Sequence, residues 1–323
     1  MKERLLKYLV CPECRGELTL LNPTRQGDEI WEAELNCASC QHAYKVVEGI
    51  PRFVPEALDS VVQRNVKNFG AQWHLLDERS DVNRREFLSY LDKVSPDFFK
   101  GKLVLDAGCG MGKFLYYAAE WGAEDVIGVD LSNSVEVASR WTREMPNAHV
   151  IQADIYKLPL RDRFDFIYSI GVLHHLPDPP AGFRSLTKLL NRGGTILAWV
   201  YGYEGNQLYI KLADPMRWIT CRLPFWLNKL GAQLLAGILW LIIWAVYLPA
   251  NRLGFKRLPM NDYFLYFYEL GFQFFWGTVL DKMIPSISHH YRRDEFAHWW
   301  ENFVDVRLVQ RNGNSWTGVG VKA

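Results

Sequence analysis

The sequence has almost no net charge. Its 37 lysines and arginines face 36 aspartates and glutamates, which leaves +1 over 323 residues. A chain without an overall basic field does not attract nucleic acid by its charge, so we do not expect nucleic acid among its partners. The first residues also lack the apolar run of a signal peptide, which predicts a cytoplasmic protein.

Cysteine is scarce as well, with only six in the chain. Four of them form two Cys-x-x-Cys pairs, Cys11 with Cys14 and Cys37 with Cys40. Two such pairs place four thiolates around one tetrahedral Zn²⁺, and no ligand position is left for water or substrate. We therefore predict a structural zinc ribbon over residues 1–57, with a β-hairpin formed by residues 17–21 and 30–35.

A glycine turn follows a short apolar run in the middle of the chain. Leu103 to Leu105 are continuously apolar, as in a strand buried on both faces, and a helical pattern begins at Lys113. Asp106 and three glycines at 108, 110 and 112 lie between them. This order lets a backbone approach a nucleotide-like ligand closely, but the glycine spacing does not fit a dinucleotide fingerprint. No Lys-Ser/Thr follows, which excludes a triphosphate-binding loop.

Acidic residues recur at the ends of the following strands. Residues 126–129 end at Asp130, residues 149–153 end at Asp154, and residues 164–169 form a fourth apolar strand. Ligands of open parallel sheets bind outside the carboxyl ends of the strands, and an acid at the second tip suits the hydroxyls of a ribose. Three acids at three successive strand ends therefore predict one nucleoside site.

Five segments in this order resemble the class I S-adenosylmethionine-dependent methyltransferases. They are Val104-Leu-Asp-Ala-Gly-Cys-Gly110, Gly128-Val-Asp-Leu-Ser132, Ala153-Asp154, Val172-Leu-His-His-Leu-Pro177 and Leu190-Asn-Arg-Gly-Gly-Thr195. The resemblance covers residues 65–202 and, weakly, 288–323. It implies an α/β fold with a doubly wound, mostly parallel, seven-stranded Rossmann-like sheet. Residues 9–14 and 44–51 are similar to the small zinc-ribbon proteins that activate tRNA and protein methyltransferases.

With this resemblance, each acidic strand tip receives a part of S-adenosylmethionine. Asp106 would meet the ammonium group, and the backbone at Gly108 and Gly110 the methionine portion. Asp130, followed by Leu131, would accept the ribose hydroxyls. Asp154 and Ile155 would meet the adenine. Trp73, in Phe69-Gly-Ala-Gln-Trp73, would close over the cofactor near its sulfonium.

The acceptor side offers several candidate bases. His174 and His175 follow the fourth strand, Tyr201 follows the fifth, and His290 precedes the last segment of the fold. A base is needed if the acceptor is a hydroxyl, whereas the activated donor otherwise requires mainly alignment. No acidic metal triad is visible, so we predict no catalytic metal.

Residues 203–287 form an unusually long and aromatic insertion between the methyltransferase core, 58–202, and the C-terminal completion of its sheet, 288–323. Between Leu230 and Ala250, Gln233 is the one strongly polar side chain, a length that could span a membrane. The chain must return to the same sheet, however, which argues against a single crossing. The alternatives are a helical lid, a homodimer face, or contact of residues 223–280 with the inner face of a membrane.

These features predict an S-adenosylmethionine-dependent methyltransferase with structural Zn²⁺. We expect a small-molecule, glycan or lipid-linked acceptor, methylated at oxygen. The alternatives are an RNA- or ribosome-directed methyltransferase and a non-catalytic cofactor-binding or activator module.

Overall fold

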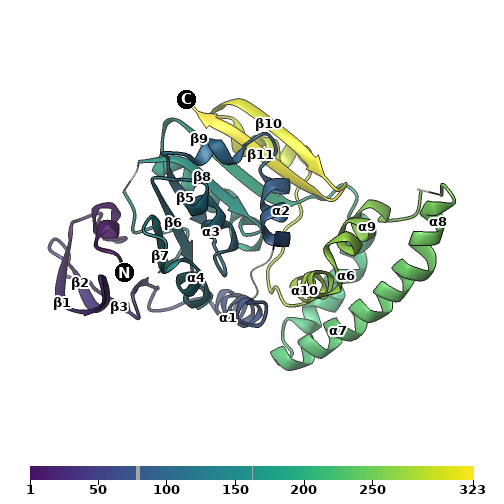
Figure 1. The fold of residues 1–323 in the computed structure, drawn as a ribbon, viewed down its shortest axis with the longest axis horizontal. Coiled ribbons are helices and arrows are strands. Elements are labelled where there is room, and N and C mark those ends of the chain that lie inside the picture. The colour runs from purple at the N-terminus through teal and green to yellow at the C-terminus, as the bar shows by residue number, and fades with distance from the viewer. Residues whose placement is uncertain (78–80, 162, 256) are drawn as a thin grey trace.

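The computed structural model describes residues 1–77, 81–161, 163–255 and 257–323. Its centre is a block of five parallel strands in the order β7-β6-β5-β8-β9 (Figure 1). Their bounds are β5 (Leu103–Ala107), β6 (Asp125–Asp130), β7 (Ala148–Ala153), β8 (Phe164–Ile170) and β9 (Leu190–Tyr201). The antiparallel strands β11 (Ser315–Lys322) and β10 (Phe303–Arg311) follow at the β9 edge, which gives the seven strands predicted for the methyltransferase fold.

The apolar runs form these strands because both faces of the sheet are covered. Every residue of β5 is buried, and successive side chains of this strand point into two different hydrophobic cores, Leu105 into one and Val104 into the other. The connecting helices are α3 (Lys113–Glu120), α4 (Val135–Thr142) and α5 (Pro179–Leu189). Parallel strands need such crossovers, so all five strands present their carboxyl ends at one edge.

The N-terminal segment does not form a separate layer but continues the same sheet. After a 3₁₀ turn, η1 (Glu3–Tyr8), the antiparallel strands are β1 (Leu18–Gln26), β2 (Glu29–Cys37), β3 (Ala43–Val47) and β4 (Ile50–Phe53). β4 pairs in parallel with β7 through Arg52 opposite Gln152, so the sheet has eleven strands in the described part of the chain. The sequence predicted the ribbon hairpin but not this pairing.

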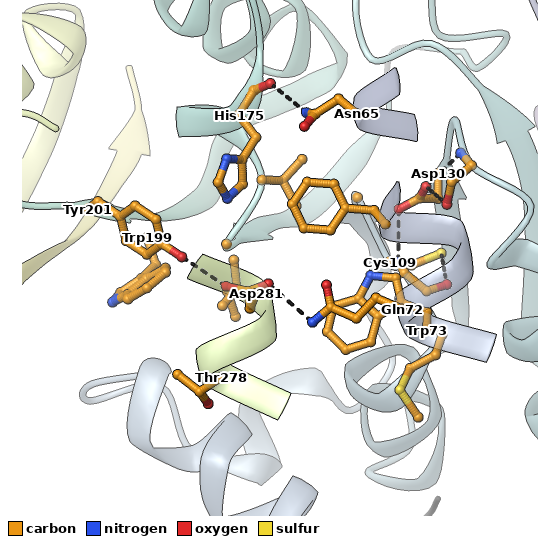
Figure 2. Close-up of a pocket in the computed structure, with 18 of the residues that line it drawn as sticks. Asn65, Gln72, Trp73, Cys109, Asp130, His175, Trp199, Tyr201, Thr278 and Asp281 are labelled. Atoms are coloured by element: carbon orange, nitrogen blue, oxygen red, sulfur yellow. Dashed lines mark hydrogen bonds between the residues drawn. The ribbon is translucent and has the colours of Figure 1, made fainter. Parts of the chain in front are cut away.

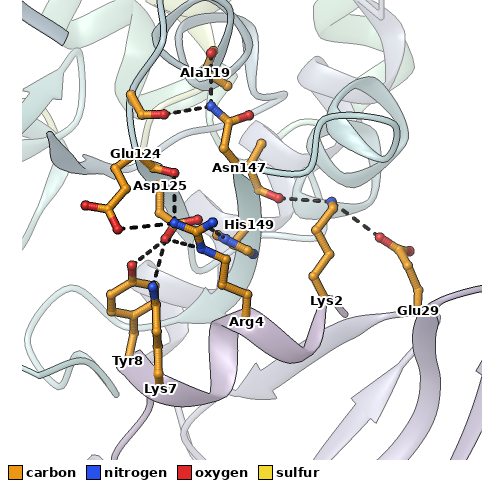
Figure 3. A network of polar contacts seen from close by, with 12 residues as sticks. Lys2, Arg4, Lys7, Tyr8, Glu29, Ala119, Glu124, Asp125, Asn147 and His149 are labelled. Carbon is orange, nitrogen blue, oxygen red and sulfur yellow. Dashed lines mark hydrogen bonds and ion pairs between the residues drawn. The ribbon is translucent and has the colours of Figure 1, made fainter. Parts of the chain in front are cut away.

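A buried carboxylate at the start of β6 anchors the ribbon (Figure 3). Asp125 accepts hydrogen bonds from Tyr8 and, at 2.7 Å, from Arg4 Nε of the ribbon, and His149 Nε2 of β7 lies 2.9 Å from its other oxygen. Lys7 Nζ adds an ion pair at 3.2 Å. Burial alone raises the pKa of Asp125, but the hydrogen bonds from His149, Tyr8 and Arg4 outweigh it and hold this pKa well below the usual range.

The remaining helices lie around the sheet, and those of the insertion lie on the side away from the ribbon (Figure 1). Two of them, α1 (Ser60–Leu75) and α2 (Asp81–Tyr90), precede β5, and the short α11 (Arg293–Ala297) precedes β10. The insertion forms α6 (Gln207–Thr220), α7 (Phe225–Ile242), α8 (Leu248–Arg252), α9 (Asn261–Leu270) and α10 (Phe272–Met283). These helices have a hydrophobic core of their own, built around Ala232, Ala236 and Phe275. The boundaries at 57, 202 and 287 stay predictions.

We expect Asp125→Ala to lower the free energy of unfolding by about 3–5 kcal/mol, because it removes the carboxylate of an ion pair and leaves the buried Tyr8 and His149 without their acceptor. Since the folded-state pKa of Asp125 is depressed, its contribution is present above the unfolded carboxyl pKa of about 4 and is lost as pH falls below it. Denaturant unfolding at pH 7 and pH 3 measures both effects.

The neighbouring Glu124→Ala is the control. Glu124 forms an exposed ion pair with Arg4 at 3.2 Å, which is worth less than about 1 kcal/mol. Equal losses in the two variants would contradict the anchoring role of Asp125.

Candidate active site

A cavity of about 1330 Å³ opens at the carboxyl edge of the parallel strands. The loops after β5, β6, β7 and β8 form one wall, and helices α1, α2, α9 and α10 form the others. A single drug-sized ligand occupies about 300–1,000 Å³, so this volume has room for a cofactor and an acceptor together. Figure 2 shows Asp130, Cys109 and Trp73 on one side and Tyr201, Trp199 and Asp281 on the other.

The turn after β5 presents bare backbone to the cavity. Gly108 has φ +84° and a Cβ there would lie 2.2 Å from Val172 Cγ2, so no larger residue fits. Gly110 has φ +52°, and a Cβ on it would lie 3.2 Å from Trp73 Nε1. Trp73 of α1 therefore covers the turn, and its closing over the cofactor stays a prediction.

Asp130 joins this turn to the tip of β6. One of its carboxylate oxygens accepts the Gly110 backbone N–H at 3.0 Å, and the other accepts the backbone N–H and hydroxyl of Ser132 at 2.8 and 2.7 Å. Burial raises the pKa of Asp130. A carboxylate oxygen has more than one acceptor site, so Asp130 can still receive ribose hydroxyls from the cavity.

Asp106 lies under the turn rather than on the cavity wall. It is 2% exposed, and within the described residues one of its carboxylate oxygens has no hydrogen-bond partner. Burial raises its pKa to about 8. A buried acceptor without a partner fits the ammonium group of a bound amino acid moiety, which Asp106 would reach through a water molecule. A cation this close would lower the pKa of Asp106 and so favour its charged carboxylate form.

The loop after β7 supplies the outer end of the site. Asp154, Ile155 and Leu131 line the cavity, and one oxygen of Asp154 accepts the Tyr156 backbone N–H at 2.9 Å. Burial raises the pKa of Asp154. The carboxylate and the apolar side chains lie where the resemblance implies the adenine of S-adenosylmethionine.

The opposite end of the cavity contains a charged pair that the sequence analysis missed. Asp281 of α10 accepts the Tyr201 hydroxyl at 3.0 Å, and Lys282 Nζ lies 3.5 Å from the centre of the Tyr201 ring. Burial lowers the pKa of Lys282 to about 8. The sequence could have indicated this pair, because Asp281 and Lys282 are the only charged residues of α10, Phe272–Met283.

The candidate histidines differ in their access to the cavity. His175 lines it and its Nδ1 donates to the Ile287 carbonyl at 2.7 Å, which leaves Nε2 as an acceptor. His290 lines it too and stacks on Tyr201. Burial lowers the pKa of His175 to about 4 and that of His290 to about 3, so both are neutral at pH 7. His174 is fully buried, with its ring 3.8 Å from the Tyr201 ring, and does not line the cavity.

The four paired cysteines meet at one point of the ribbon. Their sulfur atoms all lie within 4.8 Å of one another, with Cys11 Sγ 3.5 Å from Cys40 Sγ and Cys14 Sγ 3.4 Å from Cys37 Sγ. Four thiols at this spacing, none in a disulfide, fit a tetrahedral Zn²⁺ with no open position. The metal would hold the loop of Cys11, whose neighbour Val10 donates to the Pro159 carbonyl of the catalytic domain at 3.0 Å.

We expect Asp130→Ala to weaken binding of S-adenosylhomocysteine by about 10- to 100-fold, because it removes charge-assisted hydrogen bonds to the ribose and frees the Gly110 turn. Isothermal titration measures the dissociation constant. Asp97→Ala, which removes an exposed carboxylate outside the cavity, should bind as the unaltered protein does. An unchanged constant for Asp130→Ala would remove the ribose assignment.

We expect Cys37→Ser to lose the bound zinc and to unfold the ribbon at a lower temperature, since so small a module depends on its metal. Metal analysis of the purified protein and a thermal melt measure the two effects. Cys221→Ser, at a cysteine outside the cluster, is the control. A zinc-free Cys37→Ser protein that melts like the control would show that the metal is not structural.

Comparison with known proteins assigns both halves of this arrangement. Residues 105–198 match the family model of a methyltransferase domain, and residues 2–49 match that of Trm112p-like proteins. A tRNA U34 carboxymethyltransferase of Pseudomonas aeruginosa is 35% identical over 155 residues, covering 43% of this chain and 48% of the relative. The tRNA U34 carboxymethyltransferase of Idiomarina loihiensis is 29% identical over 191 residues, which cover 57% of this chain and 53% of the relative. The chain thus spans about half the length of these curated relatives.

Among solved structures, the complex of the Haloferax volcanii Trm112 methyltransferase activator with a methyltransferase is 15% identical, covers 81% of this chain and 97% of that one, and has a TM-score of 0.47. The matched segments contain the glycine turn and all four of the paired cysteines. The chain therefore contains an S-adenosylmethionine-dependent methyltransferase domain, matched over residues 105–198, and an N-terminal zinc ribbon like that of the Trm112p-like proteins, matched over residues 2–49, with S-adenosylmethionine and structural zinc as the cofactors.

Proposed function

We propose that this protein transfers a methyl group from S-adenosylmethionine to a nucleobase of RNA, with tRNA as the substrate class to test first. The observation that carries the proposal is that the relatives of the methyltransferase core are named as tRNA U34 carboxymethyltransferases. The cavity supports it, because its acceptor end is aromatic and carries a cation.

This proposal corrects two expectations from the sequence. The expected small-molecule, glycan or lipid-linked acceptor, methylated at oxygen, is wrong in view of these relatives, and so is the exclusion of nucleic acid as a partner. The exclusion rested on a net charge of +1. Net charge is an average over the chain, whereas an extruded nucleotide needs only a local cation and an aromatic wall.

The acceptor end is built mainly by the insertion. Aromatic side chains form its wall: Trp199, Tyr201, Tyr209, Tyr263, Tyr266, Phe267 and Phe274. Aromatic faces stack with any base, and each stacked base contributes about 1–3 kcal/mol to binding. A nucleobase that leaves its helix could therefore be held between these rings and the turn that receives the cofactor.

Lys282 is the cationic side chain of this end, next to the Asp281 carboxylate that holds Tyr201. Its Nζ lies over the Tyr201 ring, and no ion pair of Lys282 is found among the residues that the structure describes. The nearby Arg217 is neutralised by Asp214 at 2.6 Å. Lys282 is therefore the side chain best placed to receive a phosphate or an anionic base edge.

The reaction requires alignment more than acid–base work. The bound sulfonium supplies an activated methyl group, and the chain positions the acceptor atom in line with it. Asp281 holds the Tyr201 hydroxyl, and Gln72 Nε2 of α1 donates to the same carboxylate at 3.4 Å. These contacts join the sheet, α1 and α10 around the acceptor. His175, neutral and with a free Nε2, is the group that can accept a proton there.

The test is transfer of labelled methyl from S-adenosylmethionine to bulk tRNA taken from cells that lack the protein. Nucleoside mass spectrometry identifies the product. We expect Lys282→Ala to reduce transfer by about tenfold or more, because a buried charge contact to the substrate is worth 2 kcal/mol or more.

Lys229→Ala, at a lysine of α7 outside the cavity, is the matched control and should retain full transfer. Binding of the cofactor without label in any RNA fraction would reject the proposal and favour a cofactor-binding or activator module. Equal activity of the two lysine variants would reject the role of Lys282.

A further inference from the structure

The outer face of α7, together with the π-helical turn that continues it, η4 (Ile243–Tyr247), is an apolar stripe exposed to solvent. Its side chains recur every three or four residues along one side of the helix and are 49–65% exposed: Trp226, Leu230, Leu234, Ile238, Leu241 and Trp244. The opposite side carries Ala232, Ala236 and Ile243, which are completely buried in the core of the insertion. Figure 1 shows α7 at the outer margin of the molecule, farther from the sheet than α10. We call these six residues the outer stripe.

The stripe belongs to an unusually long apolar helix. Helices α7 and α8 belong to one continuous helical run of 28 residues from Phe225 to Arg252. Its most apolar window of 18 residues has a mean hydropathy of 1.9, and only 22% of that window is buried. A core helix of this composition would be mostly buried. A soluble surface helix would instead place polar residues outward. The outer stripe therefore requires a covering partner.

The tertiary structure excludes a crossing of the membrane by this helix as the explanation. Helix α10 packs along the inner side of α7 and carries Asp281 and Lys282 into the cavity. A bilayer around α7 would surround α10 as well, and burial of these charges in hydrocarbon is costly. A helix that lies flat on its partner covers the outer stripe and still leaves the charges of α10 outside the apolar environment.

In the sequence, the segment that carries the stripe has charged residues of a single sign. Between Asp214 and Asp262 the sequence contains no acidic residue. The charged residues of this interval are all basic: Arg217, Arg222, Lys229, Arg252, Lys256 and Arg257. A second copy of the chain would bring the same basic charges against these. An anionic surface is the complementary partner.

We propose that the outer stripe docks this protein on the surface of a membrane that contains anionic lipids. The apolar side chains enter the boundary between headgroups and acyl chains, and Trp226 and Trp244 lie at the depth that tryptophan prefers. Arg222, Lys229 and Arg252 meet the headgroups. The protein is thus peripheral to a membrane, with α10 between the lipid and the acceptor end of the cavity. The docking does not depend on the identity of the acceptor.

Flotation of the full chain with vesicles tests the proposal. We expect binding to phosphatidylcholine vesicles containing phosphatidylglycerol, and weaker binding to phosphatidylcholine alone. The triple variant Leu234→Glu, Ile238→Glu, Leu241→Glu should reduce the vesicle-bound fraction by about tenfold or more, because carboxylates do not enter the apolar boundary. Val304→Glu, at a half-exposed valine of β10, should bind as the unaltered chain does.

A second variant separates charge from folding. Lys229→Glu with Arg252→Glu keeps the stripe and should abolish the preference for anionic vesicles, while titration with S-adenosylhomocysteine shows that each variant is folded. Failure of the full chain to float, or equal flotation of the triple variant, would overturn the proposal. So would a dimer in sedimentation that the triple variant dissociates, since a second copy would then cover the stripe.

Discussion

The hydrogen bond from the Gly110 backbone N–H to Asp130 is the contact on which the cavity depends. It joins the turn after β5 to the tip of β6, the adjacent parallel strand. The turn can approach the carboxylate because Gly108 and Gly110 adopt positive φ values that side chains would oppose. The floor of the cavity is consequently backbone, and Trp73 covers it. Asp106 below and Asp154 beside this turn are then at fixed positions relative to one bound nucleoside.

The same strand connects the two halves of the protein. Asp125 begins β6 and holds the ribbon, whereas Asp130 ends β6 and faces the cavity. The zinc cluster orders a module whose strand β4 covers the edge of β7. An uncovered edge strand is a site for aggregation, so this pairing gives the ribbon a stabilising role. The ribbon covers the β7 edge of the catalytic sheet, and the insertion covers the carboxyl ends of its strands.

The insertion has two faces with different tasks. Its inner helices bring Asp281, Lys282 and several aromatic rings to the acceptor end, and its outer helix presents an apolar stripe with basic neighbours. The chain is nearly neutral only because acidic residues elsewhere balance this basic segment. Net charge was therefore a poor guide to partners, since binding responds to the local field and not to the sum.

The sequence by itself determined the methyltransferase sheet, the zinc cluster and the position of the cofactor turn. The sheet was predicted from the resemblance to a known family, whereas the glycine turn and the cysteine cluster are local patterns that specify their own geometry. The tertiary structure decided what depends on contacts between distant segments. In the structure β4 pairs with β7, and Asp106 lies below the cavity wall. His174 is buried, and Lys282 of the insertion lies over Tyr201 of the sheet. No local pattern encodes those pairings, because each arises when two separately folded surfaces pack together.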